Sequence, residues 1–467
     1  MRPANIQSSP IQQLTFIYLS VGVLAFAIRL FFNFSQELIP GVNGGYYPVQ
    51  VRAILKQGSL SFADMPLLFY LDAGIIKMIS LLNFSVTDDL ILNVVKLIDS
   101  ISVPILLIPL YKISRYEKDN LTKAEEFSLV CFAVLSFSPL ILLSDLQKNA
   151  VAIIFSLSCL ACMIGYQHEK KPLSLILACI FLVLAGLTHF GTFSFLVFFL
   201  LLYVGFTFKR NAIVPLMVTI AVSLALVAFF DIKRFNRLIS IGTLAFQKPA
   251  LTNGTLSTPD LLIVSFSVLL AIAGISVMVN KKKKLPDHQR GILFANIVCL
   301  LLFSFVLLDT EYFRRLSLFL FIPQLLTALY LYSNIHRKIA VSILVSLLFL
   351  TGISILAVIG RRKEVVIHEL AYDDLKNLNS MIKKDNETIV IARHGLEWWI
   401  AWALELKVGQ DKAMTGDFYS RYKNIYFIHQ LNTGSTKERR TQFREPLIPP
   451  NADWIYSSTY FNLYHLK

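Results

Sequence analysis

"PGVNGGYYPVQVRAILKQGSLSFADMPLLFYL", residues 40–71, is the stretch that decides the fold of this 467-residue chain. It follows directly on an apolar run, yet it is too polar and too rich in glycine to form another membrane span. Its first half has Arg52 and Lys56 interleaved with apolar residues and Gly58 just beyond, which predicts a short helix at a membrane surface. A second such helix is expected after Pro66. The connection 35–89 is therefore expected to be a large loop with two helices on or in the membrane surface.

The composition places this loop in a multi-pass membrane protein. Hydrophobic residues make up 55% of the chain and charged residues only 16%, so there is too little polar surface for a soluble globule. Apolar stretches of about 18 to 23 residues recur along the chain, each long enough to cross a bilayer as a helix. We expect about eleven spans, at residues 12–33, 90–113, 127–143, 150–166, 173–188, 192–208, 213–230, 260–279, 291–308, 316–333 and 339–359.

The basic residues beside these spans predict the orientation. If the N-terminus is cytoplasmic, the cytoplasmic connections hold most of the basic residues near the membrane: Lys112, Arg115, Lys118, Lys123, Lys170, Lys171, Lys209, Arg210, 281–284, Arg290, Arg337 and Lys338. The other side carries a smaller group, Lys233, Arg234, Arg237 and Lys248. This orientation puts the loop 35–89 and everything after Arg361 on the outer face of the cell membrane.

The distribution of charge and the positions of the cysteines argue against a nucleic-acid partner and against a disulfide framework. The formal net charge is +14, but most of the excess lies in short loops at membrane edges, where it meets lipid headgroups, so no nucleic-acid partner is expected. All five cysteines fall within predicted spans, so the outer segments contain no disulfide framework.

A small second domain is expected at residues 361–467, after a membrane domain at 1–360. The pattern there is helix 369–383, strand 388–392, helix 397–406, strand 425–428 and strand 454–459. Strands that alternate with helices predict a compact α/β domain.

The first outer loop resembles that of the GT-C glycosyltransferases, in particular the group with the aminoarabinose transferases and the protein O-mannosyltransferases. In that group an acidic residue after the first span is followed by a Tyr, a helix, a Gly, and an acidic residue before a Pro-Leu pair. The matching positions are Tyr47, Arg52, Gly58 and Asp64, the last within "ADMPL". The motif covers only about thirty residues, whereas the order of spans, loop and outer domain fits along the whole chain.

The resemblance implies a definite chemistry. Enzymes of this class move a sugar from a polyprenyl-phosphate donor to an acceptor at the outer membrane face, here a cell-envelope glycan, lipid or protein. Such a reaction requires a carboxylate for the acceptor, a cationic group or a divalent metal for the leaving phosphate, and an apolar groove for the prenyl chain. Membrane lipids are the remaining expected partner.

The sequence departs from the family pattern at Asn43, where the resemblance implies an acidic residue. An amide can bind an acceptor hydroxyl but cannot take its proton at neutral pH. Glu37 or Asp64 can serve instead, or the acceptor is already anionic. A fourth possibility is a catalytically silent relative that assists assembly of envelope polysaccharides.

Further site residues are expected at the outer ends of the spans. Asp145 and Lys148 lie between the third and fourth spans, either as an ion pair at the interface or as functional groups. His189 lies at a tight outer turn and is a metal ligand, with Asp64, or a hydrogen-bonded turn residue. Tyr47 is a further candidate because of its place in the loop motif.

The segment before the tenth span carries Glu311, Arg314 and Arg315. A guanidinium fork matches a lipid phosphate, so we expect the two arginines to bind the donor phosphate, with Arg52 and Lys148 as further candidates. Arginines at this depth can also reach headgroups without any further role.

Three other classes share this composition. A secondary transporter or a lipid flippase is disfavoured because no internal repeat and no matching pair of broken spans is evident. A polysaccharide polymerase usually carries its long loop between late spans. The silent assembly partner is favoured by Asn43.

Overall fold

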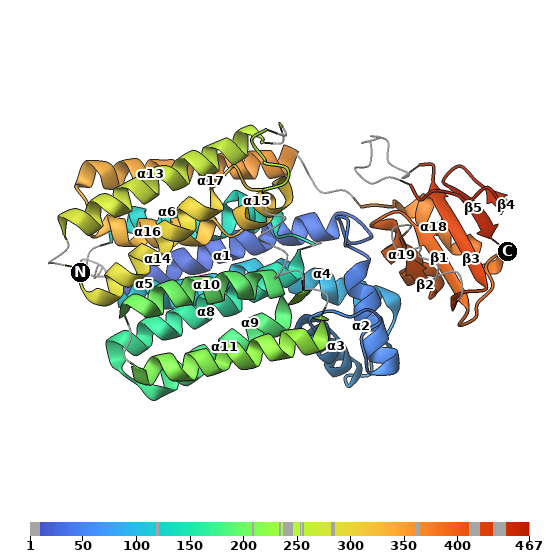
Figure 1. Cartoon of the computed structure of the whole chain (residues 1–467), viewed down its shortest axis with the longest axis horizontal. Helices are drawn as coiled ribbons and strands as arrows, with labels where there is room; N and C mark the ends of the chain where they lie inside the picture. Colours follow the sequence, from blue (N-terminus) through green and yellow to red (C-terminus); the bar gives the residue numbers. More distant parts are fainter. Residues whose placement is uncertain are drawn as a thin grey trace, which may run out of the picture. The chain divides into compact units, whose positions relative to one another are not determined.

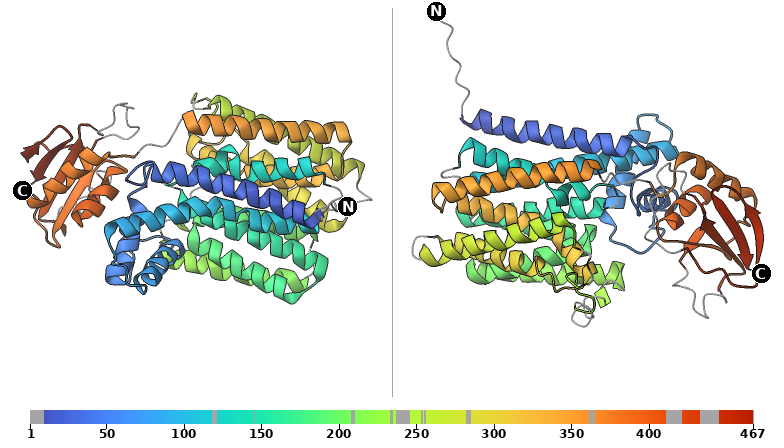
Figure 2. Two further views of the ribbon diagram at one scale, coloured as in Figure 1. Left: turned by 180° about the vertical axis from the view of Figure 1, so that it is seen from behind. Right: turned by 90° about the horizontal axis from the view of Figure 1, so that it is seen from above.

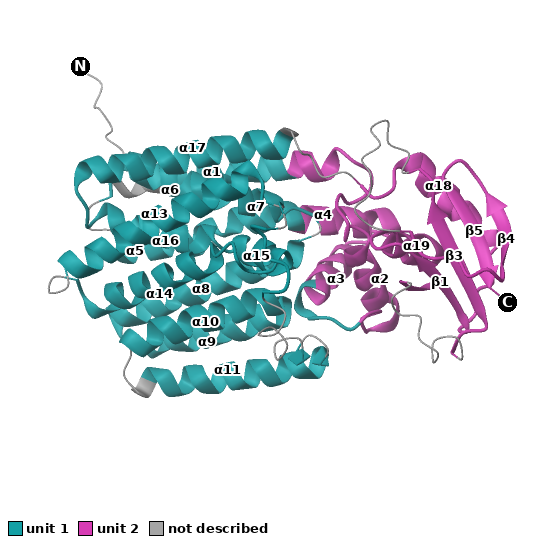
Figure 3. Cartoon of the chain, turned by 45° about the horizontal axis from the view of Figure 1, so that its top comes forward, with its two compact units in different colours: residues 1–29, 63–68, 99–361 teal, residues 30–62, 69–98, 362–467 magenta. Residues whose placement is uncertain are grey.

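The computed structural model describes residues 10–117, 121–144, 146–207, 210–232, 235–236, 246–252, 254, 256–281, 285–360, 365–410, 421–432 and 445–466. Several residues named above lie outside this part of the chain: Lys118, Asp145, Lys209, Lys233, Arg234, Arg237, 282–284 and Arg361. Clustering of contacts divides the protein into two compact units, residues 1–29, 63–68 and 99–361, and residues 30–62, 69–98 and 362–467 (Figure 3).

Helices form most of the chain (Figure 1). Their bounds are α1 Pro10–Phe34, α2 Tyr46–Gln57, α3 Leu67–Ser80, α4 Asp88–Ile105, α5 Leu107–Tyr116, α6 Lys123–Leu135, α7 Phe137–Ile141, α8 Gln147–Glu169, α9 Pro172–Thr188, α10 Phe190–Thr207, α11 Arg210–Phe230, α13 Thr258–Asn280, α14 Asp287–Phe303, α15 Thr310–Ser317, α16 Phe321–Tyr332, α17 Arg337–Gly360, α18 Glu369–Asn377 and α19 Leu396–Leu404.

The membrane character expected from the composition is confirmed. Within the described residues, 8 helices or joined helix pairs are long and apolar enough to cross a membrane, and up to 9 if α15 and α16, bent by 46°, form one span. Every stretch expected to span the membrane is largely helical, but α9 and α14, each of 17 residues, are not among these candidate spans, so the described residues give fewer candidates than the eleven expected. The second expected span is a helix interrupted at Leu106, just after Pro104, because proline removes a backbone hydrogen bond within the helix.

The first unit is a bundle of long helices that run roughly alongside one another (Figure 2). The helix α8 packs on α5 and α9, α14 packs on α10 and α13, and α17 packs on α6. Their facing surfaces form one large apolar core, in which the Phe195 and Phe319 rings stack at 5.3 Å. Many outward-facing side chains, such as Phe229 at 81% exposure, are apolar, as expected for helices that face lipid.

The second unit contains α2, most of α3 and α4, the helices α18 and α19, and a five-stranded sheet. The strands are β1 Thr388–Ala392, β2 Lys407–Gly409, β3 Asn424–Gln430, β4 Ala452–Ser457 and β5 Phe461–Leu466. Their order is β2-β1-β3-β5-β4. The strand β1 pairs in parallel with both β2 and β3, whereas β5 pairs antiparallel with β3 and β4.

The two helices predicted in the first loop are present. Gly58 ends α2 in the left-handed region, with φ of 75°, which glycine adopts without steric cost. The strand predicted at 388–392 coincides with β1, and the predicted helices and the strands at 425–428 and 454–459 match observed elements to within a few residues, except that the helix expected to reach residue 383 ends at Asn377. Two strands, β2 and β5, were not predicted.

Candidate active site

Asp64 and Lys148 form the central ion pair of the first unit. Asp64 lies just before α3, and Lys148 lies in the first turn of α8. The Lys148 ammonium donates a very short hydrogen bond to Asp64 Oδ2, and the Met65 N–H donates to Oδ1 at 2.7 Å. The carboxylate is fully buried and the lysine side chain is 10% exposed. In a buried pair of this kind each charge compensates the other for lost hydration.

A second buried ion pair fixes the backbone near Lys148. The Arg29 guanidinium lies 3.1 Å from Asp99 Oδ1, and both side chains are almost completely buried. The same guanidinium donates to the backbone carbonyls of Pro139 at 3.0 Å and Leu142 at 3.1 Å. Asp99 Oδ2 accepts the Ser144 N–H at 2.9 Å. These bonds hold the segment between α7 and α8 and so set the start of the helix that carries Lys148.

A basic pocket lies at α15. Its volume is about 350 Å³, and its lining residues are Lys248, Asp309, Thr310, Glu311, Arg314, Arg315 and Leu318. Lys248 reaches this pocket because its segment pairs with the chain before α15: the Ala250 N–H donates to the Leu308 carbonyl at 2.9 Å, and the Thr310 N–H donates to the Lys248 carbonyl at 3.0 Å. Three cationic side chains therefore surround one concave surface.

The two arginines of the pocket differ in their surroundings. Arg315 forms an exposed ion pair with Glu311 one helical turn earlier, and such a pair stabilises little because water and salt screen it. Arg314 is also exposed and makes no ion pair with another described residue. Both guanidinium groups are therefore accessible to an anionic ligand.

The helix α7 connects the pocket to the Asp64–Lys148 pair. The Ser138 hydroxyl donates to the backbone carbonyl of Ser317 at 3.3 Å, which joins α7 to the end of α15. The same short helix leads into the segment that Arg29 and Asp99 hold. Three of the cationic groups predicted for the donor phosphate, Arg314, Arg315 and Lys148, thus belong to the first unit, whereas Arg52 belongs to the second.

Glu37 and Asn43 lie in the second unit. The Glu37 side chain is exposed, and its backbone carbonyl accepts a bond from Lys96 Nζ at 2.5 Å. Partial desolvation and then the neighbouring charge of Glu369 raise the pKa of the Glu37 carboxyl. Asn43 is half-buried in a turn, where its carbonyl accepts the Tyr46 N–H at 3.0 Å. A carboxyl whose pKa is raised toward neutrality suits proton transfer, which an amide cannot perform.

Tyr47 and Arg52 serve the packing of the second unit. The Tyr47 ring is buried against Phe69, at 5.9 Å between centroids. The Arg52 guanidinium is 4.0 Å from the centre of the Trp402 ring and donates to the backbone carbonyls of Ala401 at 2.9 Å and Trp402 at 2.7 Å. These bonds satisfy carbonyls at the end of α19, so the side chain of Arg52 is engaged within the protein.

His189 ends α9, and its ring is tied to the next helix. Nδ1 accepts the Thr192 N–H at 3.1 Å and lies 2.9 Å from the Thr192 hydroxyl, the arrangement of a hydrogen-bonded turn residue. Among the residues that the structure describes, one cluster of three potential metal ligands is found, Glu117, His168 and His288. It includes neither His189 nor Asp64, the two ligands expected from the sequence.

Sequence reasoning missed Arg29, Asp99 and Lys96. Each is a charged residue within an apolar helix, and ionisable groups at such positions are costly unless they are paired or functional. The stretch "AFAIRLFF" shows Arg29 as a lone charge among apolar residues. The partners of Arg29 and Lys96, however, lie far away in the sequence. Lys248 was noted only for orientation, since no local pattern connects it with Arg314.

Comparison with protein families gives no match, and comparison with curated proteins gives none either. Solved structures do match. An oligosaccharyltransferase from Archaeoglobus fulgidus aligns over 89% of this chain and 69% of its own, with a TM-score of 0.59 and 13% identity. ArnT from Cupriavidus metallidurans, solved bound to undecaprenyl phosphate, aligns over 97% of both chains, with a TM-score of 0.54 and 10% identity.

A third similar structure is the mycobacterial arabinofuranosyltransferase AftD, with a TM-score of 0.55 and 12% identity. The match covers 95% of this chain but only 40% of AftD. All three are GT-C glycosyltransferases. The chain therefore has the GT-C fold, and the resemblance inferred from its first loop is confirmed at the level of the fold.

Proposed function

We propose that this protein is a membrane glycosyltransferase that moves a sugar from a polyprenyl-phosphate donor to an acceptor of the cell envelope. In this reaction an acceptor oxygen attacks the anomeric carbon of the sugar. The bond between that carbon and the phosphate oxygen breaks, polyprenyl phosphate leaves, and a carboxylate takes the acceptor proton. The basic residues beside the spans favour the outer membrane face for this chemistry.

The observation that carries the proposal is the buried Asp64–Lys148 pair in a chain with the GT-C fold. Asp64 is the acidic residue of the loop motif, and it pairs with a lysine from a helix that is distant in the sequence. Apolar side chains could fill the same buried space without any charge. A buried charge pair contributes little net stability compared with apolar residues of similar volume. Its presence therefore favours a functional reason for keeping both charges.

The donor phosphate is assigned to the basic pocket. Lys248, Arg314 and Arg315 present three positive charges around one cavity that also holds the carboxylates of Asp309 and Glu311, and guanidinium groups bind phosphate oxygens in pairs. A phosphate that gains charge as the sugar leaves is stabilised by such fixed cations. Lys148 is the further cation proposed for this role, oriented by Asp64.

For the acceptor we propose two alternative carboxylates. Asp64 is the candidate named by the motif, although its ion pair with Lys148 must open before it can accept a proton. Glu37 is exposed and has a raised pKa, which suits a general base. Asn43 is proposed to bind the acceptor hydroxyl through its amide.

One observation favours a second function. Asn43 occupies the position where the family pattern has an acid, so a silent relative that binds polyprenyl phosphate and assists polysaccharide assembly is the alternative. Such a protein would bind the donor but would not release polyprenyl phosphate from it.

The proposal is tested with the purified full-length protein in lipid vesicles. A panel of labelled polyprenyl-phosphate sugars is supplied with envelope extract, and labelled acceptor is measured for the native protein and for Asp64→Asn. Asp287→Asn is the matched control, since Asp287 is exposed at the start of α14. Transfer by the native protein and the control supports the proposal. Binding of donor without any transfer by the folded native protein would support the silent relative.

A further inference from the structure

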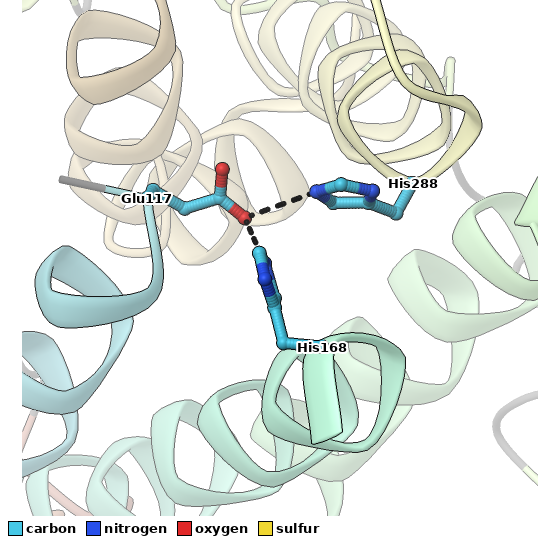
Figure 4. Close-up of side chains that lie close together, drawn as sticks. All are labelled: Glu117, His168 and His288. Carbon is cyan, nitrogen blue, oxygen red and sulfur yellow. Dashed lines mark hydrogen bonds and ion pairs between the residues drawn. The ribbon is translucent and has the colours of Figure 1, made fainter. Parts of the chain in front are cut away.

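Three potential metal ligands converge at the end of the first unit remote from Lys148. Glu117 follows α5, His168 lies in the last turn of α8, and His288 lies in the first turn of α14 (Figure 4). Lys148 and His168 belong to the same helix, and twenty helical residues span about 30 Å. The cluster is therefore separate from the residues assigned to sugar transfer.

The distances within the cluster fit a small cation. Glu117 Oε1 lies 3.3 Å from His168 Nε2 and 3.5 Å from His288 Nε2, and the three ligand atoms all lie within 4.8 Å of one another. In a tetrahedral zinc site with bonds of about 2.0 to 2.1 Å, neighbouring ligand atoms are about 3.3 to 3.4 Å apart. The two separations from Glu117 Oε1 are close to this value, and the two imidazole nitrogens, at most 4.8 Å apart, can approach each other to share one ion.

Polar contacts orient the Glu117 carboxylate, whereas His288 Nε2 has no hydrogen-bond partner among the described residues. His168 Nε2 lies 3.3 Å from Glu117 Oε1, within hydrogen-bond distance. Gln289 Nε2 donates to the second carboxylate oxygen at 2.8 Å. His288 Nε2 is buried and makes no hydrogen bond within the described part of the chain. A buried nitrogen of this kind requires an explanation, and a bound ion supplies one.

The surrounding helices are held close enough to fix the three ligands. A Cβ at Gly165, in α8, would lie 2.9 Å from the Tyr116 hydroxyl, and a Cβ at Gly291, in α14, would lie 2.1 Å from Thr207 Oγ1. A side chain at either glycine would require Tyr116 or Thr207 to move; one glycine lies a turn before His168 and the other a turn after His288. The Tyr116 ring also stacks on His168, with centroids 5.4 Å apart. The site is thus built by packing on α5, α8, α10 and α14.

From this geometry we propose that Glu117, His168 and His288 bind one divalent transition-metal ion, with zinc as the best fit. Two imidazoles and one carboxylate suit zinc and similar ions, whereas magnesium and calcium prefer oxygen ligands alone. A water molecule completes a tetrahedral shell. Because the ligands come from three elements that are distant in sequence, the ion cross-links α5, α8 and α14 and stabilises this end of the bundle.

The first test measures metal content. The full-length protein is purified with a tag that contains no histidine, reconstituted in lipid nanodiscs, equilibrated with zinc and separated from free ion. We expect one zinc per chain, lost in His288→Ala and in Glu117→Ala. His336→Ala is the matched control, because His336 is an exposed histidine just before α17, and Asp64→Asn excludes binding at the proposed active site. Equal zinc in the native protein and in His288→Ala would overturn the proposal.

A second test does not depend on loss of binding. Cobalt replaces zinc in such sites and reports a tetrahedral shell through its visible absorption, and a cysteine at a ligand position adds a sulfur-to-cobalt band in the near ultraviolet. We expect that band in cobalt-loaded His288→Cys and not in His336→Cys. Gln289→Ala, which removes the bond to the ligand carboxylate, is expected to weaken zinc binding about 10- to 100-fold. A folded His288→Cys protein without the new band would contradict the proposal.

Discussion

Lys148 and Asp64 form an ion pair that is almost wholly buried, although 84 positions separate them in the sequence. Removal of one partner leaves the other charge buried and uncompensated, which costs about 3 to 5 kcal/mol. We therefore expect Lys148→Met to lower the thermal unfolding temperature clearly and to abolish sugar transfer. The double variant Asp64→Asn/Lys148→Met is expected to recover much of the stability and none of the activity.

Thermal unfolding and transfer measured on the two single variants and the double variant check this coupling. Asp64→Asn tests whether the buried site tolerates an amide in place of the carboxylate. If the loss of stability in the double variant equals the sum of the losses in the two single variants, Asp64 and Lys148 do not stabilise each other and the prediction is wrong.

The Arg29–Asp99 pair is expected to act on the backbone between α7 and α8. Arg29→Met removes the donors to the Pro139 and Leu142 carbonyls, so this segment should open more readily. Hydrogen exchange followed by mass spectrometry should show faster exchange in the peptide that contains Ser144, with helices far from it unchanged. Unchanged exchange in that peptide would show that packing alone holds the segment.

The basic pocket predicts changes in donor affinity. Arg314→Gln and Arg315→Gln should each raise the donor KM about tenfold or more, since a hydrogen bond to a charged group contributes about 1.5 to 3 kcal/mol. Glu311→Gln should lower the donor KM, because it frees Arg315 from its ion pair. Steady-state kinetics with varied donor measures all three.

Arg290→Gln is the matched control for the pocket, since Arg290 is a partly exposed arginine of α14 that pairs with Asp287. Its donor KM should equal that of the native protein. Equal effects of Arg290→Gln and Arg314→Gln would indicate a general effect of surface charge.

Acid should weaken the second unit through Asp385. The Thr388 hydroxyl and then Lys383 hold the pKa of this carboxyl at about 2, below the ordinary value of 3.8. A depressed pKa contributes stability above pH 4, and this contribution is lost as the pH falls from about 4 to about 2. Native protein and Asp385→Asn should therefore differ in stability at pH 7 and converge near pH 2. Urea unfolding of the full chain, followed by fluorescence over this range, measures the difference. A constant difference at all pH values would contradict the assignment.

Local patterns predicted much of the fold. Apolar stretches of sufficient length gave the membrane helices, and alternation with turn residues gave β1 and α19 within a residue or two. The strand β2, of three residues, was too short to show any period, and β5 follows β4 so closely that "FNLYHL" carried no separate boundary. Its place between β3 and β4 depends on pairing across the sheet.

Local patterns identified Asp64 and Lys148 but not their pairing with each other, and Asp64 was expected to share a metal with His189. Asp64 was identified from the loop motif and Lys148 from its place at a span end, but the sequence suggested Asp145 as the neighbour of Lys148. Residues that pair across a long stretch of sequence show no regular spacing from which the pair could be predicted. Arg52 was named as a further candidate for the donor phosphate, and the bonds of its guanidinium to the carbonyls of Ala401 and Trp402 join residues too far apart in the sequence for a local pattern to show.

The most direct test of the central claim follows donor and acceptor in one reaction. The reconstituted native protein is given a polyprenyl-phosphate sugar labelled in the sugar, and labelled acceptor and free polyprenyl phosphate are measured together beside Asp64→Asn. We predict that both products form in equal amounts and that Asp64→Asn lowers their rate about 100-fold or more, the usual effect of losing an acid–base group. Equal rates for the native protein and Asp64→Asn, or no release of polyprenyl phosphate from any bound donor, would contradict the account.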